Sequence, residues 1–112
     1  MIMAIHCLVA VLILSAEFCT GQDDHYVQKI RPLINERCLA CHGALKQEAG
    51  LRLDTGQLIR KGGDNGPVVD TVNVSDSLLL MRLTSDDRDI RMPPDGMSLT
   101  EEQVNQFRHW IR

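Results

Sequence analysis

Two cysteines and a histidine stand close together in the segment Cys38-Leu39-Ala40-Cys41-His42. The two intervening residues separate the sulfurs around one turn of chain, so that each thiol can reach one of the two vinyl groups on a porphyrin edge. The imidazole of the next residue is then brought beneath the iron. A C-x-x-C-H segment is typical of covalent haem attachment. The spacing therefore predicts haem c bound through Cys38 and Cys41, with His42 as one ligand of the iron.

Three other chemistries also use closely spaced cysteines. A structural zinc site normally needs four protein ligands, and no second Cys or His pair follows this one. Thiol–disulfide exchange uses C-x-x-C in a βαβ context, and no strand pattern surrounds these residues. A structural disulfide between Cys38 and Cys41 would close a very short loop and stabilise little. A disulfide protein without haem is kept as the third hypothesis for this chain.

An electron carrier also needs a second axial ligand, and methionine partners histidine on the iron of cytochromes c. Met92 is predicted as this ligand, because Pro93 and Pro94 follow it and stiffen the loop that would hold its thioether. Met97 is the nearby alternative. Met81 lies among leucines and is expected to fill the core, as methionines often do.

Two further histidines, His25 and His109, lie opposite the apolar faces of the helices predicted around them. They are expected on the surface, and a bis-histidine iron site is the minor alternative.

Length and composition further limit the number of domains and the class of protein. The chain has 112 residues, which indicates one domain. Aromatic residues make up only 4% of the chain, which is few for the hydrophobic core of a small domain. A buried cofactor would supply the apolar contacts that these few side chains do not provide. The net charge of -3 and the scattered arginines exclude the basic surface of a nucleic-acid-binding protein.

The N-terminus resembles an export signal. The segment from Ile5 to Leu14 is almost wholly apolar and too short to span a membrane comfortably, and small residues follow it. Residues 1–21 are predicted to be a signal peptide or an N-terminal membrane anchor, and residues 22–112 a single domain. The location would then be periplasmic or otherwise extracytoplasmic, and Cys7 and Cys19 would fall within the signal.

A helix is predicted over residues 23–37, where Val27, Ile30 and Ile34 recur at helical spacing. Pro32 stands inside this pattern and must bend or interrupt the helix, because it lacks a backbone donor. Its position opposite the apolar face limits the damage to packing.

The rest of the chain shows two more helices and long loops. Residues 43–74 are glycine-rich and predicted to be loop. A helix is expected over 76–84, capped by Ser75 and turning Leu79, Leu80 and Leu83 inward. The last helix runs from about residue 101 to the end, with Thr100 and Gln103 as a capping box and Val104, Phe107 and Ile111 on one face. No strand shows convincing alternation, so the predicted class is all-α.

These motifs, taken in order, resemble the planctomycete-type cytochrome c domain over nearly all of residues 25–112. The matching segments are Tyr26–Leu33, Cys38–Gly43, Gly50–Asp54, Gly62–Pro67, Ser77–Leu79, Met92–Pro94 and Trp110–Ile111. The resemblance implies a small class I-like domain of three or four helices, with long loops wrapped around a haem. It implies haem attachment at Cys38 and Cys41, His42 as the proximal ligand and Met92 as the distal ligand.

The first functional hypothesis is therefore a carrier of single electrons with one covalent haem c and no enzyme activity. The alternatives are a haem enzyme or sensor with an open distal position, or the N-terminal redox domain of a larger exported protein. The expected partner is a redox protein or a fused domain. Arg52 is a candidate to neutralise a haem propionate.

Overall fold

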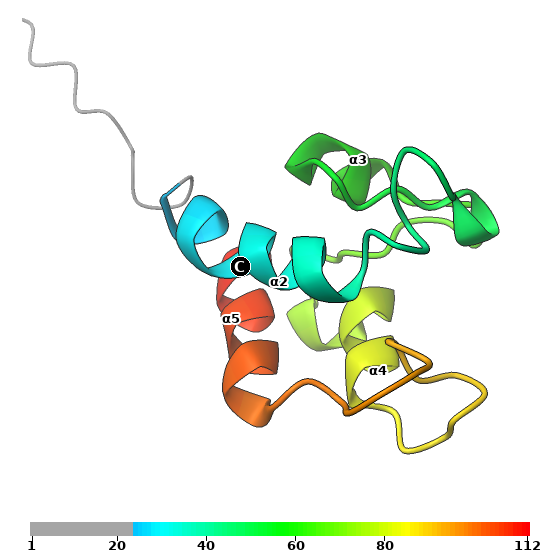
Figure 1. Ribbon diagram of the computed structural model, residues 1–112. Coiled ribbons are helices and arrows are strands. Elements are labelled where there is room, and N and C mark those ends of the chain that lie inside the picture. Colours follow the sequence, from blue (N-terminus) through cyan, green and yellow to red (C-terminus); the bar gives the residue numbers. More distant parts are fainter. Residues whose placement is uncertain (1–23) are drawn as a thin grey trace, which may run out of the picture.

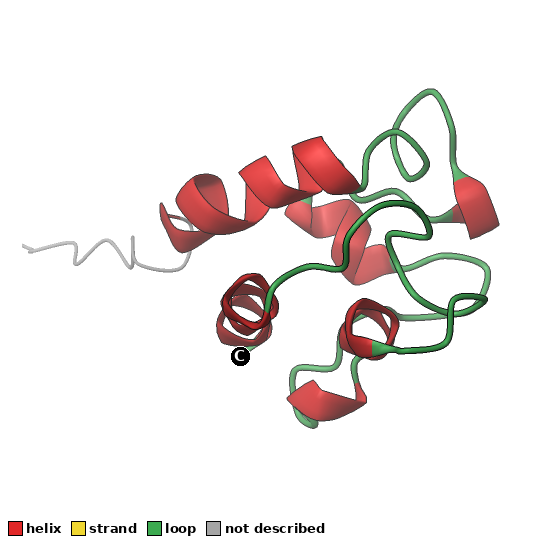
Figure 2. Ribbon diagram, turned by 60° about the horizontal axis from the view of Figure 1, so that its bottom comes forward, coloured by secondary structure: helices red, strands yellow, loops and turns green. Residues whose placement is uncertain are grey.

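The computed structural model describes residues 24–112, which form a helical domain with long connecting loops (Figure 1). The α-helices in this range are α2 (Arg31–Arg37), α3 (Gly56–Lys61), α4 (Leu78–Thr84) and α5 (Glu101–Ile111). The described residues contain two isolated β-bridges and no strand, so the all-α class is confirmed. Figure 2 shows the loops gathered on the side of the molecule toward which α2 ends. The predicted signal at 1–21 lies outside the described residues.

The first helix changes its winding just before Pro32. Residues Tyr26–Ile30 form a π-helical turn, η1, in which Arg31 donates its N–H to the carbonyl of Tyr26, and α2 then begins. In a continuous α-helix the proline ring would press on the carbonyl four residues earlier. The wider turn relieves that contact.

The π-turn also changes which residues of the first helix face the core, and the predicted inward position of Val27 was wrong. Ile30 and Ile34 are buried, with 0% and 2% of their surfaces exposed, but Val27 is 43% exposed. A π-turn holds more residues than an α-turn, so the residue four places before Ile30 comes onto the buried face. Tyr26 accordingly packs against the core where Val27 was expected.

Helices α4 and α5 carry most of the predicted core. Leu79, Leu80 and Leu83 of α4 are buried, as are Val104, Phe107 and Ile111 of α5. Trp110, which was not predicted on that face, is buried as well. Helix α5 packs against both α4 and η1, so the core lies where these three elements meet. The capping box is confirmed: the Thr100 hydroxyl accepts from the Gln103 N–H, and the Gln103 side chain accepts from the Thr100 N–H.

The predicted start of α4 was wrong by two residues. A short 3₁₀ turn, η3 (Val74–Asp76), occupies the expected first turn, and Ser77 stands at the N-cap position in place of Ser75. The Ser77 hydroxyl is buried and accepts a 2.9 Å hydrogen bond from the N–H of Asp70. A tertiary contact with the preceding loop has taken the oxygen that would otherwise cap the helix.

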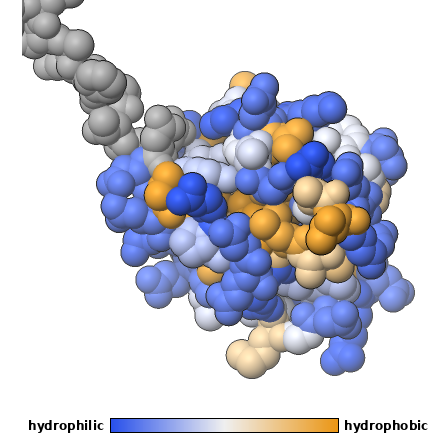
Figure 3. Space-filling view, turned by 45° about the horizontal axis from the view of Figure 1, so that its top comes forward, coloured by the Kyte–Doolittle hydropathy of each residue, from blue (hydrophilic) through white to orange (hydrophobic). Residues whose placement is uncertain are grey.

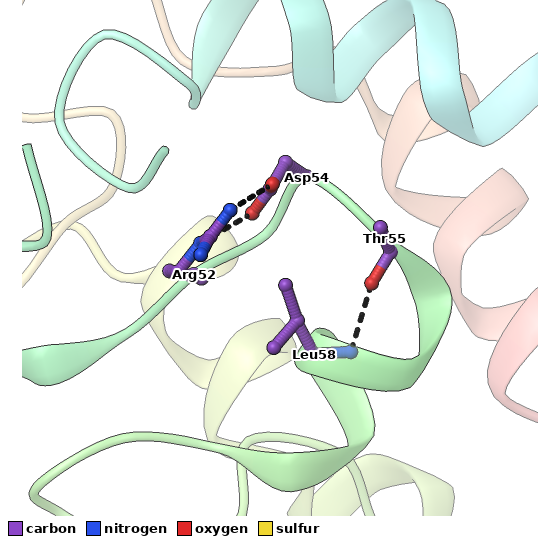
Figure 4. Close-up of polar contacts among 4 residues, drawn as sticks. All are labelled: Arg52, Asp54, Thr55 and Leu58. Atoms are coloured by element: carbon purple, nitrogen blue, oxygen red, sulfur yellow. Dashed lines mark hydrogen bonds and ion pairs between the residues drawn. The ribbon is translucent and has the colours of Figure 1, made fainter. Parts of the chain in front are cut away.

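Helix α3 lies inside the stretch predicted to be loop. The hydroxyl of Thr55 caps it by accepting from the N–H of Leu58 (Figure 4), and it ends at Gly62, whose φ of 76° suits glycine. A further 3₁₀ turn, η2 (Glu48–Gly50), precedes it. Six residues are too few for a helical period to stand out in the sequence, and most of the stability of so short a helix comes from packing. Ile59, fully buried, anchors it to the core.

None of the helices among residues 24–112 has the length and apolar character needed to cross a membrane.

Candidate functional site

The Cys38–His42 segment forms a compact turn at the end of α2. The carbonyl of Ile34 accepts hydrogen bonds from the N–H groups of both Cys38 and Leu39, at 2.9 and 3.1 Å. The carbonyl of Cys38 then accepts from Cys41 and His42, at 3.2 and 3.0 Å. Local backbone bonding therefore keeps both thiols and the imidazole within one turn of chain.

Gly43 allows this turn to close. A Cβ atom at this position would lie 2.6 Å from the backbone oxygen of Leu39, closer than real Cβ atoms come to a neighbour. The glycine is buried, and its N–H donates to the carbonyl of Lys46 at 2.8 Å. The absence of a side chain is thus part of the geometry of the site.

The imidazole of His42 is held by the backbone of the next loop. Its Nδ1 lies 3.3 Å from the carbonyl oxygen of Leu51, and the N–H of Leu53 donates to the His42 carbonyl at 2.8 Å. A carbonyl oxygen only accepts hydrogen bonds, so Nδ1 is the donor in this contact and Nε2 is the nitrogen left to bind a metal. A second partner of this kind commonly orients a metal-binding histidine.

The thiol of Cys38 is largely buried. Burial raises its pKa to about 11, and the nearby Arg37 guanidinium opposes this shift only in part. The sulfur is therefore a neutral thiol at physiological pH. Disulfide exchange uses a thiolate, so this environment does not favour that alternative.

The turn opens onto a cavity of about 440 Å³, which lies within the range of roughly 300–1,000 Å³ found for ligand pockets. Both cysteines, His42 and Met92 line it. Aliphatic walls complete it, including Leu51, Leu53, Val68, Leu79 and Leu83. Apolar side chains also gather across one face of the molecule, framed by hydrophilic ones (Figure 3). A donor set of two thiols, one imidazole and one thioether around an aliphatic space fits a haem with two axial ligands.

The structure separates the three candidate methionines. Met92 is half-buried in the cavity wall, and its N–H donates to the carbonyl of Arg82 at 2.9 Å. Met97 is 82% exposed and Met81 is 55% exposed, and neither lines the cavity. The expectation that Met81 fills the core was wrong, because the adjacent leucines take the inward face of α4.

His25 and His109 lie outside the cavity. Their rings meet edge to face with centroids 4.6 Å apart, and His25 Nε2 lies 3.2 Å from the carbonyl of Gln106. His109 is exposed, as expected, whereas His25, directly before η1, is half-buried. The contact between the two rings was not evident from their separate positions in the sequence.

Arg52 does not line the cavity. Its guanidinium forms a paired contact with the carboxylate of Asp54, with N···O distances of 3.0 and 2.5 Å (Figure 4). The cations that do line the cavity are Arg37, Lys46 and Arg82. No local spacing distinguishes these from the other basic residues, so the sequence alone did not reveal them.

An apolar cavity bordered by a C-x-x-C-H turn on one element and a methionine loop on another defines a small c-type cytochrome domain. Comparison with protein families agrees: the Planctomycete cytochrome C family matches residues 38–96, and the chain belongs to this family. Its cofactor is accordingly haem c, an iron porphyrin bound covalently. No curated protein and no solved structure gave a match.

Proposed function

We propose that the domain carries single electrons on one haem c, with Cys38 and Cys41 as its attachment points and His42 and Met92 as the axial ligands. The observation that supports this most strongly is that the imidazole and the thioether line the same cavity as both thiols. The haem supplies an iron that cycles between ferric and ferrous states.

The cysteines would anchor the cofactor from the end of α2. Each thiol would add across one vinyl group of the haem: the S–H bond and the vinyl π bond break, one C–S and one C–H bond form, and no external oxidant is needed. The backbone bonds to the carbonyls of Ile34 and Cys38 hold the two sulfurs in place during this step. Attachment at both ends of one turn would fix the orientation of the porphyrin edge.

His42 would bind the iron through Nε2. The Leu51 carbonyl holds the opposite nitrogen as a donor, which sets the tautomer and directs the lone pair away from that loop. Met92 would complete the coordination. Histidine with methionine raises the reduction potential, and the aliphatic walls exclude water and favour the less charged ferrous centre.

The test uses the protein produced with the c-type maturation machinery. Intact mass and a haemochrome spectrum report attachment, and the methionine-to-ferric-iron charge-transfer band reports Met92 ligation. Met92→Ala should abolish that band and permit rapid carbon monoxide binding, whereas the exposed Met97→Ala should retain the band. Protein of unmodified mass without Soret absorbance would refute the proposal. A wild-type protein with haem, no band and rapid carbon monoxide binding would instead indicate a haem enzyme or sensor.

We further propose that the domain works outside the cytoplasm, with residues 1–21 as signal or anchor, and exchanges electrons with a redox protein or a fused domain. Cytochrome c domains are typically extracytoplasmic, and this supports the location. N-terminal sequencing of the exported protein would test the processing: a start at Gln22 supports cleavage, and a start at Met1 contradicts it.

A further inference from the structure

The loop that carries Met92 is held to the helices at three points. The Met92 N–H donates to the carbonyl of Arg82, and the Arg82 side chain donates from Nη1 to the carbonyl of Ile90 at 3.2 Å. On the other side of Met92, Nη2 of Arg37 donates to the carbonyl of Met97. The two guanidinium groups thus bind loop carbonyls on either side of the methionine.

These two arginines come from opposite parts of the fold. Arg37 is the last residue of α2, directly before Cys38, and Arg82 lies in α4. Both line the cavity. Each therefore joins the wall of the cavity to the loop, and Arg37 joins the cysteine turn to a segment 60 residues further along the chain.

Taking Met92 ligation from the proposed function, we propose that Arg37 and Arg82 are positioning residues that clamp the Met92 loop closed over the haem cavity. The loop between α4 and α5 has no regular helix, so ordering it costs conformational entropy. Turn bonds around Asp87 hold its first part, and the two guanidinium groups hold it nearer to Met92. A guanidinium has five N–H donors in a fixed fork. Each arginine can hold a loop carbonyl and keep further donors for carboxylates near the cavity, such as the side chain of Asp95 or a haem propionate.

The expected change in loop opening follows from the net strength of a single hydrogen bond. Both side-chain contacts are solvent-exposed, so each is expected to change the population of the open loop by about two- to tenfold. The backbone bond between Met92 and Arg82 survives substitution of the side chain. Replacing one arginine should therefore raise the population of the open loop partly, and replacing both should raise it further.

The test compares Arg82→Gln, Arg37→Gln and the double variant with Arg88→Gln, all as the haem-loaded protein. Arg88 is an exposed arginine in the same loop, so its replacement removes the same charge without removing a clamp contact. The first measurement is the rate at which carbon monoxide displaces the methionine from ferrous iron. We expect this rate to rise about two- to tenfold in each single clamp variant, to rise further in the double variant, and to stay unchanged in Arg88→Gln.

The second measurement, hydrogen exchange at the Met92 amide, does not depend on ligation. It should accelerate in the clamp variants and not in Arg88→Gln. If the wild-type protein lacks the charge-transfer band but the exchange result holds, the ligand assignment fails and the clamp stands. If the band is present and both rates in the clamp variants equal those of the wild type or of Arg88→Gln, the clamp is refuted. Arg82→Lys and Arg37→Lys keep the charge but lose the forked geometry, and exchange faster than wild type in these variants would support the clamp over a simple charge effect.

Discussion

Replacement of Gly43 by alanine places a methyl group against the most tightly closed part of the site. The new Cβ would stand 2.6 Å from the Leu39 oxygen, whereas ordinary contact begins at 3.4 Å. Either the carbonyl or the backbone at residue 43 must therefore retreat by about 0.8 Å. Leu39 lies between the two cysteines, so this movement would pass directly into the positions of the thiols and the imidazole.

The energetic cost follows from this contact. Forcing an extra methyl group into closely packed structure typically costs about 1–3 kcal/mol, because backbone atoms, unlike a flexible side chain, give way only with the whole turn. With a urea m-value of about 1–3 kcal/mol/M for a small domain, the unfolding midpoint of Gly43→Ala should fall by roughly 1 M. The fraction of protein carrying haem should fall as well, because the sulfurs no longer stand at the required separation.

The matched control is Gly56→Ala. Its Cβ would meet only Arg60 at 3.5 Å and Trp110 at 3.8 Å, both ordinary contacts, and the position lies in α3. Alanine favours helix more than glycine does, so this variant should match or exceed the wild type in stability. Urea unfolding followed by the Soret band and by circular dichroism measures both variants. If Gly43→Ala unfolds at the same midpoint as Gly56→Ala and carries as much haem, the argument from close approach is wrong.

Three further predictions concern the supporting structure. Thr100→Ala removes the capping box of α5 and should lower the free energy of unfolding by about 1 kcal/mol, measured by urea unfolding; an unchanged midpoint would show that the cap contributes nothing. The Arg52 hydrogen bond lowers the pKa of Asp54, so the paired carboxylate stabilises the fold above the ordinary Asp pKa, and that stability disappears as the pH falls through the lowered value. Asp54→Asn should accordingly destabilise the protein at pH 7 but match the wild type in acid, and an equal loss at both pH values would contradict the ion pair. Burial raises the pKa of Tyr26, whose hydroxyl finds no hydrogen-bond partner among the described residues. Tyr26→Phe should therefore cost nothing near neutral pH, and the wild type should lose stability relative to it as the pH rises above about 10 towards the raised pKa; parallel stability curves would disprove this.

Local patterns in the sequence predicted the elements well where the helices are long or capped. The capping box at Thr100 and the inward leucines of α4 are confirmed, because capping and amphipathic spacing are decided within a few residues. The short helix α3 was missed, although Thr55 and Gly62 mark its two ends in the sequence. Val27 was placed on the wrong face, since the π-turn before Pro32 changes the period on which that prediction rested.

The environments of individual side chains were harder to predict than the helices. Arg52 was a candidate to neutralise a haem propionate; in the structure it pairs with Asp54, two residues away, and does not line the cavity. Met81 was expected in the core but faces solvent. In both cases the residue type suited the role considered, and neighbouring residues in the fold set where the side chain lies.

By itself the sequence predicted the chemistry of the Cys38–His42 segment, because two thiols and an imidazole at that spacing lie within one turn of chain that backbone bonds from Ile34 and Cys38 close. It also determined the all-α class, through helical periods and caps. Only the tertiary structure decided that Met92 lines the cavity and Met97 does not, that Leu51 orients the imidazole, and that Arg37 reaches a loop 60 residues away. Contacts between distant segments depend on how the whole core packs, and no local spacing in the chain encodes them.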